Sequence, residues 1–303
     1  MSASNKILIS IIIPVFNRIY YLKKLLDSLN FQKQKYFEVI IVDDGSDDGS
    51  SENIENQIKN YNKMTIKYFK IMNSERGKAR NYGMLKSTGT YINYFDSDDI
   101  ALPNHVQIAI ETIKEYNFPN VFHLAYEKYN LKNKKIKKIV FKKKFINSYI
   151  LKKNVLSCNG VFLKREVALE NLFCENRLLS GSEDWELWLR LCKKYKILSI
   201  SIITSCVMEH GERSVNFNNY FDLKIRLELF NSLINDKNRH NLSQREIHVV
   251  YSEVQMYLAL YASVIKSNRI VTIKHLIFSI RLNTRIMFSL KFFVVIRNLF
   301  FKI

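Results

Sequence analysis

The sequence predicts an α/β fold with a mostly parallel central sheet and helices on both faces. Short apolar, β-branched segments alternate with amphipathic segments through the first half of the chain, as in successive strand–helix–strand units. Acidic residues directly follow two of the apolar segments. Because such sheets bind ligands beyond the carboxyl ends of their strands, we expect these acids to meet at one site.

Each expected element has its own local signal. Apolar and aromatic runs of strand length predict strands over 7–13, 37–42, 65–69, 91–95, 121–126 and 202–208. Helical spacing of apolar residues predicts helices over 20–29, 51–61, 78–86, 104–116 and 185–192. The run 7–13 stops at Pro14 and no small-residue cleavage site follows, so it predicts a first strand rather than a signal peptide.

Composition narrows the class of protein. The chain has 303 residues and a net charge of +19, which favours an anionic partner such as a membrane, a phosphorylated ligand or nucleic acid. Because the sequence has no arginine-rich or Cys/His nucleic-acid motif, we expect no nucleic-acid partner. The four cysteines are too widely spaced for a zinc motif and fit a reducing cytosol. No window reaches the roughly 18 apolar residues of a membrane-spanning helix.

Three carboxylates stand within four positions after the expected strand 91–95: Asp96, Asp98 and Asp99. Carboxylates this close repel one another unless a cation lies among them. Oxygen ligands suit Mg²⁺ or Mn²⁺ better than zinc. The sequence therefore predicts a metal site at a strand end, and the alternative is an acidic turn that caps the next helix.

A second acidic pair, Asp43 and Asp44, follows the expected strand 37–42. By itself it favours a glycine-containing turn, because Gly45 and Ser46 come next. A cationic loop over 73–83 enters a helix, which suits a diphosphate, although a solvated basic face has the same composition. The convergence of these segments on one rim of the sheet favours a binding site.

Five segments in order resemble the inverting family 2 glycosyltransferases of GT-A fold, the type that builds bacterial cell-surface polysaccharide. The resemblance covers about residues 9–214. The segments that carry it are Ser10-Ile-Ile-Ile-Pro-Val-Phe-Asn17, Val42-Asp-Asp-Gly-Ser46, Gly77-Lys-Ala-Arg-Asn81, Gly89-Thr-Tyr-Ile-Asn-Tyr-Phe-Asp-Ser-Asp-Asp99 and Glu183-Asp184-Trp185.

The resemblance implies a donor site for a nucleoside diphosphate sugar, with a UDP-sugar as the first candidate. It assigns donor contacts to Pro14, Val15, Asn17, Asp43 or Asp44, Arg80 and Asp96. It also implies a bound Mn²⁺ or Mg²⁺, with Asp98 as ligand and Asp99 assisting. Family members often carry a histidine at the position of His210, which makes it a candidate ligand of the metal or diphosphate; a structural histidine is the alternative.

On the acceptor side, the resemblance implies that Asp184 is the general base. The neighbouring residues Glu183 and Trp185 are candidate acceptor contacts, but each has a structural alternative. Ser180 and Glu183 have the spacing of a capping box, and a tryptophan on an amphipathic helix can pack in the core. The expected acceptor is a hydroxyl of a glycan or lipid-linked glycan.

Beyond about residue 215 the resemblance stops. We therefore expect a catalytic domain over 1–215, with a nucleotide-sugar half to about 100 and an acceptor half over 101–215, followed by a basic helical extension over 216–303. Helices are expected over 217–234, 244–266 and 270–301. On the last of these, four of five cations fall within an arc of about 120°. The last helix suits an anionic membrane or a second subunit in a homodimer.

The segment 131–145 holds eight lysines, which suits either a solvated loop or contact with an anionic lipid headgroup. Taken together, these patterns predict an enzyme at the cytoplasmic face of the cell membrane, bound peripherally. Two rival hypotheses are a nucleotidyltransferase and a non-catalytic basic module on a transferase scaffold. The first would need a glycine-rich, lysine-bearing loop after the first strand, and the second gives the carboxylates no purpose.

Overall fold

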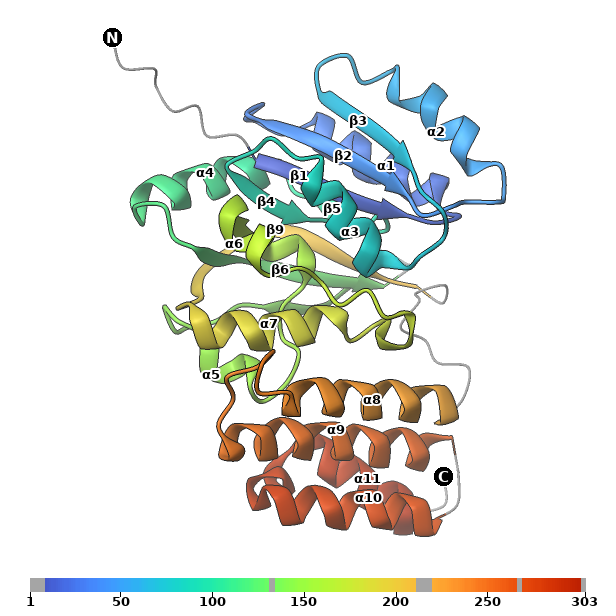
Figure 1. Cartoon of the computed structure of the whole chain (residues 1–303), viewed down its shortest axis with the longest axis vertical. Coiled ribbons are helices and arrows are strands. Elements are labelled where there is room, and N and C mark those ends of the chain that lie inside the picture. The colour runs from blue at the N-terminus through green and yellow to red at the C-terminus, as the bar shows by residue number, and fades with distance from the viewer. Residues whose placement is uncertain (1–8, 131–133, 211–219, 266–268, 301–303) are drawn as a thin grey trace.

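A computed structural model describes residues 9–130, 134–210, 220–265 and 269–300. The molecule is elongated, with a mixed sheet and its flanking helices at one end and a stack of helices at the other (Figure 1). One nine-stranded sheet runs in the order β3-β2-β1-β4-β8-β6-β9-β5, and β7 pairs with β6 outside this path. The fold is therefore α/β, as the alternation of segments predicts.

The strands β1, β2, β3 and β4 form the parallel half of the sheet. In the other half, β8 pairs in antiparallel fashion with both β4 and β6, while β6 and β9 run parallel. The strands are β1 (Ile9–Val15), β2 (Phe37–Asp43), β3 (Thr65–Lys70), β4 (Tyr91–Tyr94), β5 (Ile100–Ala101), β6 (Val121–Asn130), β7 (Lys135–Ile139), β8 (Val161–Lys164) and β9 (Leu198–Glu209).

Helices connect the strands and continue beyond them. They are α1 (Ile19–Asn30), α2 (Ser50–Ile58), α3 (Arg76–Leu85), α4 (His105–Glu115), α5 (Asn147–Ile150), α6 (Arg165–Glu170), α7 (Glu183–Lys194), α8 (Tyr220–Asn235), α9 (Gln244–Val264), α10 (Arg269–Leu282) and α11 (Leu290–Phe300), with short 3₁₀ turns at Cys158–Gly160, Arg177–Leu179 and Thr284–Phe288. Among the described residues, no helix is both long and apolar enough to cross a bilayer.

Alternating side chains of β1 divide the core into two layers. Ile9, Ile11 and Ile13 pack with the helices α1, α2 and α4, whereas Ile12 packs with α3, α6 and α7. Gly83 allows α3 to lie close to β1, because a Cβ there would be 2.5 Å from a methyl carbon of Ile12. This close packing fixes the start of α3 beside the carboxyl ends of β1 and β2.

The second half of the sheet differs from the simple parallel pattern. The short strand β8 lies between β4 and β6, so β4 and β6 are not neighbours. A four-residue strand that runs directly into α6 gives a weak sequence signal. The helix expected over 270–301 is also interrupted, because the Asn283 side chain accepts a hydrogen bond from the Arg285 amide at the 3₁₀ turn between α10 and α11.

The helices α8, α9, α10 and α11 stack below α7 at the end of the molecule away from β1 to β3 (Figure 1). Apolar side chains of α8 and α9 join the same core cluster as α7. A separate small cluster holds α9, α10 and α11 together, with Met256, Leu276 and Val295 among its members. The first residues of the helix expected over 217–234 lie outside the described part of the chain.

Candidate functional site

A cavity of about 670 Å³ opens at the carboxyl ends of β1, β2 and β4. Its walls come from the segments that follow β1, β2, β3 and β4, from the start of α3 and from the segment 177–180, so segments far apart in the sequence meet there. The lining residues are Pro14, Val15, Phe16, Arg18, Asp44, Gly45, Asp47, Asn73, Glu75, Arg76, Arg80, Asp96, Ser97, Asp98, Arg177 and Ser180. Four arginines and five acids share this wall, an arrangement that suits a ligand with both phosphate and hydroxyl groups.

The two acids at the end of β2 have different surroundings. Asp43 is fully buried and accepts hydrogen bonds from the Ser46 amide, the Ser51 hydroxyl and the Tyr68 hydroxyl. Burial opposes ionisation of Asp43, but these donors hold its pKa below the usual value. Asp43 therefore holds the turn. Asp44 lines the cavity, and burial raises its pKa.

At the end of β1, Pro14 and Val15 line the cavity, and their contact with the donor nucleotide stays a prediction. Asn17 does not line it. Its side-chain amide donates to the Asp47 carboxylate at 2.8 Å, and its carbonyl oxygen accepts from the Asp47 amide. The residue has a φ of 52°, a left-handed conformation that asparagine tolerates. Asn17 thus joins two loops of the cavity wall.

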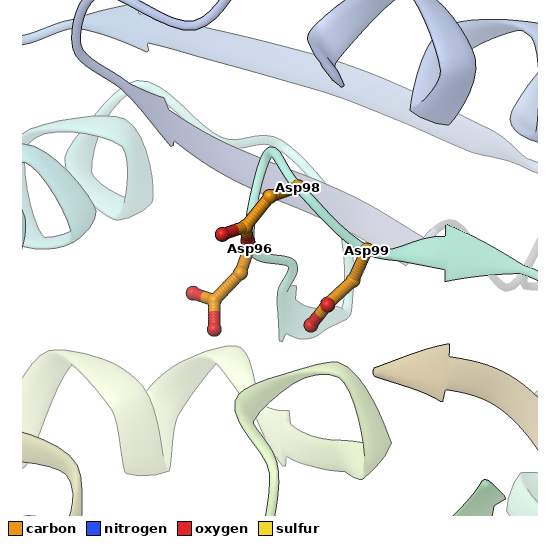
Figure 2. Close-up of side chains that lie close together, drawn as sticks. All are labelled: Asp96, Asp98 and Asp99. Carbon is orange, nitrogen blue, oxygen red and sulfur yellow. The ribbon is translucent and has the colours of Figure 1, made fainter. Parts of the chain in front are cut away.

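The carboxylates of Asp96, Asp98 and Asp99 lie close together after β4 (Figure 2). Each contributes one oxygen, and these oxygens all lie within 4.8 Å of one another. Asp96 and Asp98 line the cavity. Asp99 accepts hydrogen bonds from the Met208 amide on β9 and from the Asn159 side chain, so it also fixes the loop.

Asp98 is shared by two other side chains. Its Oδ2 accepts from Arg18 Nη1 at 3.0 Å and lies 2.9 Å from His210 Nε2. The His210 ring is buried and stacks on Tyr21, with 4.7 Å between the ring centroids. Its Nδ1 has no hydrogen-bond partner among the residues that the structure describes. His210 therefore lies beside the acidic cluster, and its role as a ligand of the metal or diphosphate stays a prediction. Arg18 was not predicted as a site residue.

The donor set of the cluster suits a hard divalent cation, because it consists of three carboxylates with one imidazole beside them. Arg18 and Arg80 neutralise part of its negative charge. Three carboxylates against two guanidinium groups still leave an excess negative charge in a largely buried place. The residues present therefore fit Mg²⁺ or Mn²⁺.

Arg80 joins the acidic cluster to α7. Its guanidinium is buried and donates to Asp96 at 2.7 Å and to Glu183 at 2.9 Å. It was predicted to contact a diphosphate, and it does line the cavity. The two carboxylates already hold two of its nitrogens, so its position also fixes the distance between β4 and α7.

The first turn of α7 carries two adjacent acids that contact different partners. Glu183 is buried and faces Arg80, and its second oxygen accepts from the Gly181 amide. Asp184 accepts from the Asn154 side chain at 2.9 Å on the outer side of the turn. Burial, then the neighbouring Glu183 charge, raises the pKa of Asp184 to about 6. An acid with this pKa can be ionised at neutral pH and still accept a proton.

The two predicted acceptor contacts are both buried. Glu183 faces inward to Arg80, so its position gives it a structural role. Trp185 packs in the core, where its ring stacks on Phe230 and its indole nitrogen donates to the Ile150 carbonyl. Trp185 thus has the core position of its structural alternative, whereas α7 begins after Ser182 without a side-chain capping hydrogen bond, so Glu183 forms no capping box with Ser180. The acceptor contacts of both residues stay a prediction.

Arg226 of α8 is a residue that the sequence did not reveal. It is buried, and its guanidinium donates to the Ser180 carbonyl at 2.8 Å. It also lies against Gly181, which has a φ of 87°. A lone arginine in a helix with equal numbers of acids and cations carries no signal of its own, so only the fold shows that it supports the loop before Asp184.

A family model described as glycosyl transferase family 2 matches residues 10–172, more than half of the chain. The α/β fold resembles that of GT-A glycosyltransferases. The chain belongs to glycosyl transferase family 2.

Proteins similar to this chain in sequence are also described as glycosyltransferases. A glycosyltransferase of Rickettsia felis described as uncharacterized is 33% identical over 194 residues, which cover 62% of this chain and 31% of the relative. Another from Haemophilus influenzae is 34% identical over 168 residues, or 54% of this chain and 64% of the relative. The match therefore covers less than a third of the Rickettsia felis relative's length.

Solved structures share the fold. Staphylococcus aureus TarS 1–349 in complex with UDP-GlcNAc has a TM-score of 0.69 and 19% identity, with 97% of this chain and 88% of that chain covered. The mannosyltransferase PcManGT from Pyrobaculum calidifontis, in complex with GDP-Man and Mn²⁺, has a TM-score of 0.59 and 13% identity, with the same shares covered. At these identities the likeness shows the fold.

Proposed function

We propose that this glycosyltransferase moves a sugar from a nucleoside diphosphate sugar to a hydroxyl group with inversion at the sugar carbon. The observation that carries the proposal is the buried chain of contacts from Asp96 through Arg80 to Glu183, next to Asp184. These contacts link the acidic cluster after β4 to the first turn of α7, which carries the candidate base. Transfer needs charge stabilisation at the leaving group and a base at the acceptor.

On the donor side, Pro14, Val15 and Asp44 line the part of the cavity proposed for the nucleotide. Asp96 and Asp98, with Asp99 and His210 beside them, would hold Mn²⁺ or Mg²⁺, which stabilises negative charge on the departing diphosphate when bound. The arginines Arg76 and Arg177 lie on the same wall. We take a UDP-sugar as the first candidate donor, since a structural relative was solved with UDP-GlcNAc.

On the acceptor side, Asp184 takes the proton of the attacking hydroxyl. A base on the face opposite the leaving diphosphate gives inversion. We propose a glycan or lipid-linked glycan as acceptor and cell-surface polysaccharide or lipopolysaccharide assembly as the pathway, at the cytoplasmic face of the membrane. We also propose residues 1–215 as the catalytic part, with 216–303 as its extension.

A thermal-shift panel tests the donor site first. UDP-, GDP- and dTDP-sugars are added to the protein with and without Mn²⁺, and the midpoint of unfolding is measured. One donor at about 100 times its Kd should stabilise the fold by about 2.7 kcal/mol. The Asp98→Asn variant should lose the metal-dependent part of this stabilisation.

A transfer assay with the donor found in the panel tests catalysis. Asp98→Asn and Asp184→Asn should both abolish transfer while the circular dichroism spectrum stays that of the wild type. Asp184→Asn should keep donor binding, since Asp184 does not line the cavity. Turnover at the wild-type rate by both variants would refute the assignment.

A further inference from the structure

We propose that the exposed faces of α10, the 3₁₀ turn Thr284–Phe288 and α11, called here the terminal face, dock on an anionic lipid surface. This proposal rests on the proposed function. It adds the kind of surface that the C-terminal helices bind. The terminal face belongs to the helices at the end of the molecule away from β1 to β3 (Figure 1). It therefore leaves the cavity beside β1 and β4 uncovered.

Charge is the first observation. Glu253 is the last acid of the sequence, so the 50 residues of 254–303 contain no acid at all. They contain eight cations, at positions 266, 269, 274, 281, 285, 291, 297 and 302. Lys291 pairs with Glu253 at 3.0 Å. The cations at 269, 274, 281, 285 and 297 form no salt bridge with a described residue, so they are available to an anionic partner.

Exposed apolar side chains accompany these cations on α10. Ile270, Ile273 and Ile277 are between 42% and 60% exposed. At 100° per residue they fall, with Lys274 and Arg281, within an arc of about 100°. Three isoleucines on the solvent side of a helix are unusual for a face that only water covers.

The same pattern recurs beyond the turn. Phe288 and Leu290 are 83% and 84% exposed, and Phe293 and Phe300 are 58% and 75% exposed. On α11 the residues 290, 293, 297 and 300 fall within an arc of about 80°. Thus both helices combine apolar side chains with arginine or lysine on one face, which is the composition of helices that lie in a membrane interface.

The charge distribution also decides which kind of partner suits the terminal face. A second copy would bring another face with cations and no acids, so the two would repel. Nucleic acid would attract the cations but would gain little from exposed isoleucine, leucine and phenylalanine. A bilayer that contains anionic lipid satisfies both features, since acyl chains take the apolar side chains and headgroups take the cations.

Vesicle sedimentation tests the proposal with the full chain and without donor. We expect binding to vesicles of phosphatidylcholine mixed equally with phosphatidylglycerol, and much weaker binding to pure phosphatidylcholine. Phe288→Gln with Leu290→Gln should weaken binding at least about tenfold. Arg281→Gln with Arg285→Gln should weaken it about thirty-fold for the anionic vesicles, with a smaller effect on neutral ones.

The matched control is Lys137→Gln with Lys138→Gln on β7, which removes the same charge from another exposed basic surface. It should leave vesicle binding close to the wild-type level. Loss of binding in this control and not in the terminal-face variants would overturn the proposal. So would a dimer in light scattering that only the Phe288 and Leu290 substitutions dissociate, or DNA binding without vesicle binding. Because no donor is present, failure here leaves the transfer reaction untouched.

Discussion

Two adjacent acids on the first turn of α7 have opposite pKa shifts. Burial would raise the pKa of Glu183, but the charges of Arg76 and Arg80 hold it below the usual value. Burial, together with the Glu183 charge, raises the pKa of Asp184 to about 6. Successive helical residues point about 100° apart, so one acid faces the arginines and its neighbour faces outward. The pair therefore combines a structural anion with a candidate base.

The raised pKa of Asp184 predicts a pH dependence of transfer. A base must be ionised, so the rate should fall as the pH decreases below about 6. The measurement is kcat/KM for the donor found in the thermal-shift panel, at pH values from 5 to 8 in steps of about one unit. A rate that stays constant down to pH 5, about one unit below this pKa, would exclude Asp184 as the titrating base.

The same shift predicts an effect on stability. Between the ordinary value of 3.8 and about 6, the folded state binds a proton at Asp184 more readily than the unfolded state does. Wild-type stability therefore falls as the pH rises through this window, and ionised Asp184 costs stability above it. Asp184→Asn should unfold at a higher temperature than the wild type at pH 7.5. This advantage should disappear near pH 4.

The acids at the end of β2 allow a matched comparison. Asp43→Asn should destabilise the fold by about 2 to 4 kcal/mol, because it disturbs three hydrogen bonds to a buried carboxylate. Asp44→Asn should lower the free energy of unfolding less than Asp43→Asn does, because burial already opposes ionisation of Asp44, but it should weaken donor binding. Denaturant unfolding and the thermal-shift panel measure the two effects. Equal donor binding by Asp44→Asn and the wild type would remove Asp44 from the nucleotide site.

At the level of single residues, the sequence reveals what is local. The acids after β2 and β4 are visible because they interrupt apolar runs, and the resemblance orders them. The contact between Arg18 and Asp98 spans 80 positions, and that between Arg226 and Ser180 spans 46. Neither has a local pattern. Likewise, sequence cannot tell that Glu183 faces inward, because that depends on where α3 places Arg80.

At the level of elements, the strands and helices of the parallel half are predictable because their periodic patterns are long. β8 and β5 are not, since four and two residues carry little periodicity. The break between α10 and α11 depends on the Asn283 cap, which an otherwise apolar, basic stretch conceals. The antiparallel insertion of β8 next to β4 is likewise set by pairing in three dimensions rather than by composition.

α7 carries Asp184, and a buried acid holds this helix to the extension. Glu186 is fully buried and contacts three cationic or basic side chains: Arg190, Arg239 and His240. Burial alone would raise its pKa, yet hydrogen bonds from His240 and Arg239 and the charge of Arg190 lower it to about 2. This node joins α7 to the segment between α8 and α9.

Glu186→Gln should therefore destabilise the protein by about 3 to 5 kcal/mol, because it leaves two buried or half-buried arginines without their counter-charge. The matched control is Glu228→Gln on α8. Glu228 is 62% exposed and pairs only with Lys224 among the described residues, so its loss should change stability by less than about 0.5 kcal/mol. Urea unfolding compares both variants. Equal free energies of unfolding for the Glu186→Gln and Glu228→Gln variants would show that the contacts of Glu186 contribute nothing to the stability of the fold.

At the level of the whole molecule, the extension shares the core of the catalytic part. Phe230 of α8 is fully buried and stacks on Trp185 of α7, with 4.9 Å between the ring centroids. Leu223 and Leu227 of α8 belong to the same apolar cluster. We infer that the helices α8 to α11 unfold together with the sheet.

Phe230→Ala tests this coupling. Removal of a buried aromatic ring should cost about 3 to 5 kcal/mol, and one cooperative transition should shift as a whole. Phe221→Ala on the same helix is the matched control, because Phe221 is 67% exposed and its loss should change stability by less than about 0.5 kcal/mol. Calorimetry distinguishes the outcomes. A separate early transition for the helices, with the sheet unchanged, would mean that the extension is an independent unit, and the support of the Asp184 loop by Arg226 would then be lost without loss of the catalytic fold.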